Sequence, residues 1–145
     1  MTDPRPDNTP PLLRVRDLRV TFPSRDGATT PVDGVSFDLQ RGETLALVGE
    51  SGCGKSLTAL SLVKLLPPPG RIDPGSVIEI KGKSVPSLTE AELRAVRGRV
   101  VGFVFQDPMT SLNPVFTVED QITEGTLAHF KTFSSWSVFQ VNRAS

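Results

Sequence analysis

The chain has 145 residues, 37% of them apolar, and its sixteen basic residues balance its sixteen acidic ones. This balance argues against binding of nucleic acid by bulk charge, and the single cysteine excludes an internal disulfide. No apolar run approaches the ~18 residues of a membrane span, and the amino-terminal residues lack the apolar core of a signal peptide.

The first expected structure is a pair of strands. Residues 1–11 carry four prolines and two aspartates and are predicted to be disordered. Apolar residues then alternate from Leu12 to Phe22, but their facing switches at Arg16–Asp17, which predicts a bulge or a break between two strands. A polar connection over residues 23–31 contains Asp26–Gly27, a turn pair.

A second candidate strand follows, in which Val35, Phe37 and Leu39 alternate with polar residues, as in a half-buried strand. Arg41–Gly42 then turns the chain into Leu45–Val48, a fully apolar run typical of a strand buried on both faces. We therefore predict an antiparallel sheet ahead of the strand Leu45–Val48.

The next eight residues, Gly49–Ser56, match the phosphate-loop pattern G-x-x-x-x-G-K-[ST] at every fixed position. The glycines let the backbone fold around an anion, and the helix starting near Lys55 directs its amides and dipole at the same point. Lys55 is expected to reach the β- and γ-phosphates of a nucleotide, and the Ser56 hydroxyl to bind Mg²⁺. The predicted nucleotide contacts are Gly49, Glu50, Ser51, Gly52, Cys53, Gly54, Lys55, Ser56 and Leu57.

A glycine-rich turn between a strand and a helix is the structural alternative. It would explain the glycines, but not the lysine–hydroxyl pair Lys55–Ser56 at the start of the helix. Cys53 occupies one of the free positions, where its backbone N–H matters more than its sulfur. The pattern therefore favours a nucleotide site.

The rest of the chain alternates between expected helices and strands. A largely buried, mostly apolar helix over residues 55–66 is ended by Pro67–Gly70, and Val77–Ile80 is a strand followed by a turn at Lys81–Lys83. The polar residues of that helix are Thr58, Ser61 and Lys64.

A threonine–glutamate capping box opens a short helix over residues 89–96, and a last helix is expected over residues 117–128. Between them Val100–Phe105 is a second apolar run typical of a strand buried on both faces, and it ends in Gln106–Pro108. Polar groups at the end of a buried strand are site candidates.

Three segments together resemble the ATP-binding subunit of ABC transporters, of the dipeptide and oligopeptide import class. They are the phosphate loop, Val32–Phe37, and Val104–Pro108 with Ser111–Pro114. The resemblance covers about Leu12 to His129 and is more specific than the phosphate loop alone. It implies an α/β fold, with a P-loop NTPase core behind an amino-terminal antiparallel β subdomain, here as an incomplete ABC ATPase domain.

The resemblance also implies roles for matching positions. Gln106 falls at the family's Q-loop glutamine, which contacts Mg²⁺ and the attacking water, so it is predicted as a catalytic and metal-binding residue; a strand-capping amide is the alternative. Phe22 lies where the family places an aromatic ring under adenine, although a phenylalanine closing an apolar strand is as readily a core residue. Residues 108–114 would face the transporter's membrane subunits.

Three other residues are weaker candidates for a site role. Asp107 follows an apolar strand, as a Walker B aspartate does, but the intervening Gln106 and the following Pro108 argue against that assignment. His129 and Trp136 have no partners at ligand or catalytic spacing, and we interpret both as structural.

Several parts of the family pattern are missing from these 145 residues: a Leu-Ser-Gly-Gly-Gln-like signature, an apolar strand ending in Asp-Glu, and a switch histidine. The expected organisation is a disordered start (1–11), the amino-terminal part of a nucleotide-binding domain (12–106), the Q-loop and the start of a helical subdomain (107–129), and an aberrant tail (130–145). We hypothesise a frameshift or an incomplete gene for the tail; the other two reading frames should then encode the missing motifs, and their absence there would refute the idea.

These residues predict binding of Mg-ATP without hydrolysis at a useful rate, and exposed apolar faces beside Leu45–Val48. By the resemblance, the partners are permease membrane subunits and a second ATP-binding subunit, at the cytoplasmic face of the membrane. A P-loop GTPase is a poor alternative, because the D-x-x-G and N-K-x-D motifs are absent. A non-catalytic fragment that binds nucleotide or permease, or an inert product, is the other alternative.

Overall fold

The computed structural model describes residues 10–105 and 112–129. The chain divides between Leu93 and Arg94 into two compact units. The first unit contains an antiparallel sheet and the helix that follows the phosphate loop, and the second contains the helix before residue 130. This arrangement confirms a mixed α/β chain with an antiparallel sheet at its amino-terminal end.

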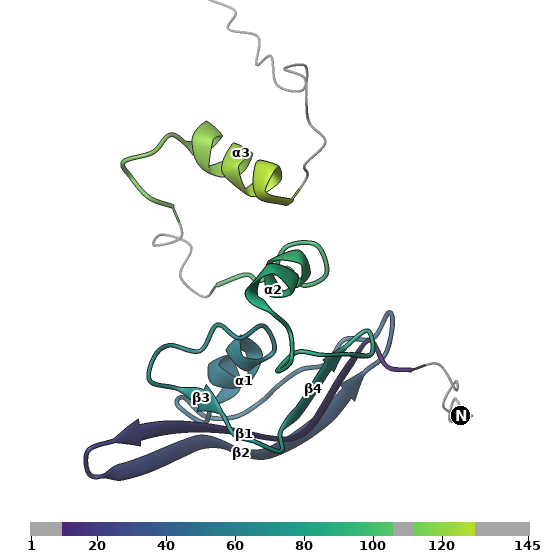
Figure 1. The fold of residues 1–145 in the computed structure, drawn as a ribbon, viewed down its shortest axis with the longest axis vertical. Helices are drawn as coiled ribbons and strands as arrows, with labels where there is room; N and C mark the ends of the chain where they lie inside the picture. Colours follow the sequence, from purple (N-terminus) through teal and green to yellow (C-terminus); the bar gives the residue numbers. More distant parts are fainter. Residues whose placement is uncertain (1–9, 106–111, 130–145) are drawn as a thin grey trace, which may run out of the picture. The chain divides into compact units, whose positions relative to one another are not determined.

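The sheet is built around one long strand. β1 (Leu13–Ser24) pairs along one edge with β2 (Gly27–Leu39), forming the hairpin that runs the length of the sheet in Figure 1. Along its other edge β1 pairs with β3 (Arg71–Ile72) and with β4 (Val77–Ile80), and β5 (Lys83–Ser84) extends the sheet beyond β4. Every pairing in this sheet is antiparallel. Because β1 and β2 precede the phosphate loop in the sequence and β3, β4 and β5 follow it, the sheet joins segments from both sides of the loop.

The predicted change of facing at Arg16–Asp17 is confirmed as a bulge. Between the pairs Val15↔Phe37 and Leu18↔Val35, β1 advances three residues while β2 advances two. Asp17 takes up the extra residue with a φ of 45°, a left-handed conformation that aspartate tolerates better than most residues. As a result Val15 and Leu18 are both fully buried, although they have opposite parity in the sequence.

The polar connection between the first two strands is shorter than the predicted residues 23–31. The strands continue to Ser24 and resume at Gly27, so the turn consists of Arg25 and Asp26 alone. The polar residues of this segment pair as a two-stranded ribbon that is mostly exposed on both faces. Such a ribbon needs no apolar alternation, which explains why the sequence pattern did not reveal it.

The core of the first unit lies between the sheet and the segments that follow the phosphate loop. Its buried apolar residues come from β1, β2 and β4 and from the chain between residues 63 and 93. They are Val15, Leu18, Val20, Val32, Val63, Ile78, Ile80, Val85 and Leu93. α1 (Lys55–Ser61) packs on β1 and β2, and this packing holds the helix that follows the phosphate loop against the sheet.

α1 is shorter than expected and buries an unexpected face. The helix ends at Ser61 rather than Leu66, and its buried residues are Thr58 and Ser61, whose hydroxyl donates to the Leu57 carbonyl at 2.6 Å. The leucines of the helix are only half-buried. The small polar face is therefore the most buried one, and the apolar face is covered only in part.

The two strands expected to be buried on both faces are not strands in this structure. Leu45–Val48 has no pairing within residues 10–105 and 112–129, and Val48 is 92% exposed. Val100–Phe105 makes one isolated bridge, between Arg97 and Val101, and Val104 is 96% exposed. A strand forms only when neighbouring strands satisfy its backbone groups, and the backbone partners of Val100 and Val101 come from the turn just before them rather than from a strand.

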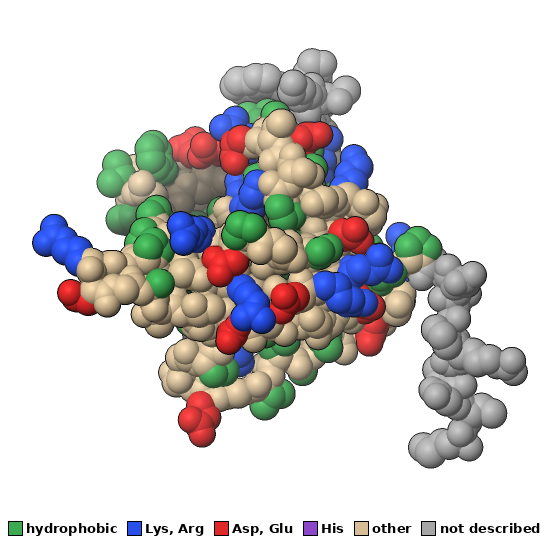
Figure 2. Space-filling model, turned by 60° about the horizontal axis from the view of Figure 1, so that its bottom comes forward, with side chains coloured by type: hydrophobic (Ala, Val, Ile, Leu, Met, Phe, Trp, Pro, Cys, Tyr) green, Lys and Arg blue, Asp and Glu red, His purple; other side chains and the backbone are tan. Residues whose placement is uncertain are grey.

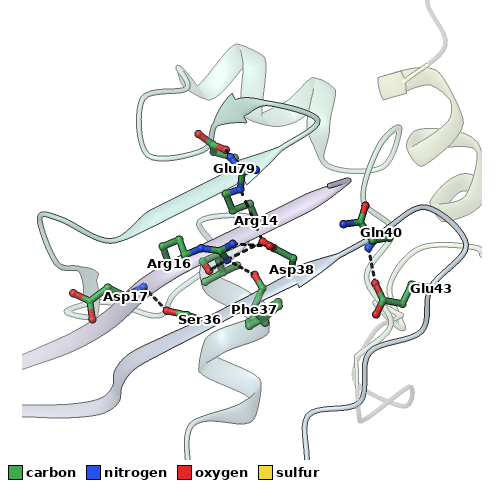
Figure 3. Close-up of polar contacts among 10 residues, drawn as sticks. Arg14, Arg16, Asp17, Ser36, Phe37, Asp38, Gln40, Glu43 and Glu79 are labelled. Atoms are coloured by element: carbon green, nitrogen blue, oxygen red, sulfur yellow. Dashed lines mark hydrogen bonds and ion pairs between the residues drawn. The ribbon is translucent and has the colours of Figure 1, made fainter. Parts of the chain in front are cut away.

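Figure 3 shows the ion pairs that connect the strands on the solvent side of the sheet. The Arg16 guanidinium donates to both carboxylate oxygens of Asp38, at 2.8 and 2.5 Å, and joins β1 to β2. The Arg14 guanidinium donates to Glu79 at 3.2 Å and joins β1 to β4. Hydrogen bonding from Arg16 lowers the pKa of Asp38 below its ordinary value.

Two predicted helix starts are confirmed. The Thr89 amide donates to Glu92 Oε2 at 2.9 Å and caps α2 (Glu90–Val96), which spans the division between the units. In the second unit the Asp120 amide donates to Thr117 Oγ1 at 3.1 Å at the start of α3 (Val118–His129). Both contacts satisfy amides that have no acceptor inside the helix.

Among the described residues, no helix has the length and apolar content to cross a bilayer. Basic and acidic side chains are interspersed on the face shown in Figure 2. This distribution agrees with the neutral composition, so the face shown offers no large patch of one sign for a polyanion.

The Asp38 ion pair predicts a pH dependence of stability. Because the pKa of Asp38 is lowered in the folded state, its contribution is complete above about pH 4, the unfolded value, and is lost as the pH falls through the folded value. Asp38→Asn should therefore lose less stability than the wild type between about pH 5 and pH 3, measured as urea midpoints. Asp26→Asn, in the exposed hairpin turn, is the control, and an unchanged acid slope in Asp38→Asn would contradict the assignment.

Candidate nucleotide-binding site

The phosphate loop is shaped by glycines in the left-handed region. Gly52 has a φ of 82° and Gly54 a φ of 91°, and α1 begins directly after Gly54. The first amides of a helix have no acceptor inside the helix, and Gly54 offers no side-chain oxygen to cap them. The loop therefore presents main-chain donors at the amino-terminal end of α1, as an anion site requires.

The Lys55 side chain folds back over the loop. Its ammonium donates to the carbonyl oxygens of Gly49 and Glu50, at 2.7 and 2.6 Å, and lies 3.4 Å from Cys53 Sγ. These contacts hold a positive charge above the loop's own backbone. Phosphate oxygens bound at the loop would meet this charge in addition to the helix amides.

The metal contact at Ser56 stays a prediction, and the structure gives the position of its hydroxyl on α1. Ser56 is exposed on the first turn of α1, beside Lys55. Within residues 10–105 and 112–129, no group of three or more His, Cys, Asp or Glu side chains could hold a metal ion alone. This donor set suits Mg²⁺ carried in by a nucleotide, since Mg²⁺ keeps its waters and takes few protein ligands.

Gly54 is required by a close main-chain contact as well as by its conformation, whereas Gly49 is close only to a side chain. A side chain on Gly54 would collide with the main-chain carbonyl of Pro31 in β2, and Gly54 is buried. A side chain on Gly49 would collide with Cys53 Sγ, a free and exposed thiol. The support from Pro31 was not anticipated; a proline inside a polar strand segment was the available signal, because it indicates a bulge.

Phe22 lies on the strand next to this support. It is half-buried, it pairs with Thr29 of β2, and the edge of its ring packs against Gly70. Thr29 is two residues from Pro31, or roughly 7 Å along a strand. Phe22 therefore has a packing contact and lies on β1, beside the strand that supports the phosphate loop, and its place under an adenine ring stays a prediction.

The remaining predicted site residues lie outside the described part of the chain. Gln106, Asp107 and most of the segment 108–114 are not described, and neither are the side chain of His129 and residue Trp136. Leu112, just after the gap, is half exposed at 51%. The role of Gln106 therefore stays a prediction.

Comparison with known proteins gives the class. The profile of the ABC transporter family matches residues 32–144, so the chain belongs to this family. Peptidoglycan transport ATP-binding protein YejF of Agrobacterium fabrum is 55% identical over 81% of the chain and 21% of its own length. Bacillus subtilis oligopeptide transport ATP-binding protein OppD and dipeptide transport ATP-binding protein DppD are 48% and 47% identical, each over 83% of the chain, and over 34% and 36% of their own lengths.

The chain thus spans between 21% and 36% of the length of these relatives. The identity confirms the resemblance to ATP-binding proteins of peptide transport and the P-loop NTPase class of the fold.

Replacing Gly54 should disturb the loop more than replacing Gly52. Both glycines have a positive φ, so alanine costs about 1–2 kcal/mol of conformational strain at either position. Only Gly54→Ala adds a collision with the Pro31 carbonyl, whereas the space around Gly52 is open. Gly54→Ala should therefore unfold at a clearly lower urea concentration than Gly52→Ala. Equal midpoints for the two variants would show that the Pro31 contact is not tight.

Proposed function

We propose that this chain carries the ATP-binding loop of a subunit that energises peptide import. The observation that carries the proposal is the combination at residues 49–56: main-chain donors at the start of α1, a glycine at position 54 that a close contact requires, and the Lys55 ammonium held over the loop. A glycine-rich turn alone has no use for such a charge. The names of the relatives support the assignment to peptide transport.

Each residue of the loop has a defined part in binding. The amides of residues 50–57 would donate to the phosphate oxygens, and Lys55 would exchange the Gly49 and Glu50 carbonyls for β- and γ-phosphate oxygens. The Ser56 hydroxyl would hold Mg²⁺, which neutralises charge on the same phosphates. Gln106 would contact Mg²⁺ and the attacking water.

The chain alone is proposed to bind Mg-ATP without turning it over at a useful rate. Its 145 residues contain neither the signature motif nor the Walker B strand nor a switch histidine. Without them no group faces the γ-phosphate from a second subunit, and no carboxylate polarises the water. The proposed partners of the working subunit are permease membrane subunits and a second ATP-binding subunit, at the cytoplasmic face of the membrane.

A second candidate is a non-catalytic fragment or an inert product. The exposure of Leu45, Leu47 and Val48 favours it, because apolar side chains beside the phosphate loop are then uncovered. Nucleotide binding separates an inert product, which would bind neither ATP nor any analogue, from a chain that binds ATP without hydrolysing it.

The test is a calorimetric titration of the 145-residue chain with Mg-ATP. Lys55→Ala should weaken binding roughly tenfold or more, because a hydrogen bond to a charged group contributes about 1.5–3 kcal/mol. Lys83→Ala, an exposed lysine in β5, is the matched control and should bind as the wild type does. Identical binding by all three proteins would refute the phosphate-loop site. Rapid Mg-dependent release of phosphate by the chain alone would refute the proposed lack of turnover.

A further inference from the structure

The edge strand β2 departs from regular pairing beside the phosphate loop. Between the pairs Val20↔Val32 and Phe22↔Thr29, β1 advances two residues and β2 advances three, so β2 bulges by one residue at Thr30–Pro31. Proline has no N–H to donate to a ladder and is tolerated at edges and bulges. Bulges re-aim the chain, and this one brings the Pro31 carbonyl against Gly54.

Val32, the residue after the bulge, is packed on two sides. Val32 is only 2% exposed and pairs with the fully buried Val20 of β1. On the other side, its Cγ2 lies 3.1 Å from the position that a Gly54 side chain would take. Val32 therefore contacts both the core of the sheet and the carboxyl-terminal end of the phosphate loop.

We propose that Pro31 and Val32 are positioning residues for the nucleotide, an inference that rests on the proposed function. They support Gly54, the residue from which α1 and its donor amides start. The same strand carries Thr29 opposite Phe22. One bulge thus sets the spacing between the phosphate loop and the aromatic ring, and with it the length of ligand that can contact both.

The test compares two buried valines that face each other in the sheet. Val32→Ala and Val20→Ala remove the same two methyl groups from equally buried positions, so their urea midpoints should fall by similar amounts. Only Val32→Ala should also weaken Mg-ATP binding, by roughly fivefold to tenfold, when both variants are titrated under conditions where each is folded. Val32→Thr keeps the shape of the side chain and should restore the affinity although the buried hydroxyl destabilises the protein.

A second probe reports on the spacing. Mg-tripolyphosphate contacts only the phosphate loop, so Val32→Ala should weaken its binding less than that of Mg-ATP. Pro31→Gly removes the ring without opening the core and should weaken Mg-ATP binding severalfold. Pro23→Gly, in the exposed part of the same hairpin, is its control and should bind normally. These glycine variants keep the test decisive if Val32→Ala does not fold.

The outcomes distinguish this inference from the function on which it rests. If the wild type binds neither Mg-ATP nor Mg-tripolyphosphate, the proposed function fails and the inference fails with it. If the wild type binds, but Val32→Ala matches Val20→Ala and Pro31→Gly matches Pro23→Gly in affinity, the positioning role alone is refuted. An equal loss for Mg-ATP and Mg-tripolyphosphate would refute the spacing role of the bulge.

Discussion

The backbone pairing of β1 with β2 is the interaction on which the rest of the first unit depends. β1 also pairs with β3 and β4, so the hairpin collects segments that come after the phosphate loop in the sequence. β2 supports Gly54 from below, through a bulge that regular pairing would not produce. Without the hairpin, α1 would have no sheet to pack on, and Gly54 would lose its contact with Pro31.

The apolar side chains near the loop show what the hairpin does not provide. α1 turns Thr58 and Ser61 toward the sheet and leaves its leucines half-buried, and Leu45–Val48 continues this uncovered surface. A helix that is apolar on most sides is built to be covered on more than one side. The described residues cover one side of it. The chain therefore has a well-packed antiparallel part and a phosphate loop whose outer layer is missing from the described residues.

Local chemistry made much of this structure predictable. The bulge at Arg16–Asp17 followed from a change of parity, and the starts of α2 and α3 followed from threonine with an acidic residue three positions on. The start of α1 followed from the glycine pattern of the loop. In each case the determining residues are neighbours in the sequence.

The failures have the opposite character. Leu45–Val48 has the composition of a buried strand, but burial is a property of its neighbours, and none of the described strands pairs with it. The support of Gly54 by Pro31 joins residues 23 positions apart, and the proline in the sequence indicates a bulge but not the residue that the bulge contacts. For the site, the loop was predictable from its motif, but the residues that hold the loop in place were not.

The two-residue turn at Arg25–Asp26 has a consequence for the order of events during synthesis. The turn brings together strands that are adjacent in the chain, so the loop to be closed is as short as a hairpin allows. Hairpins of this kind form within about 1–10 μs, whereas ribosomes add about 5–20 residues per second. The hairpin can thus begin to form before Gly54 leaves the ribosome, and it becomes stable when β3, β4 and the core residues that follow Gly54 have been added.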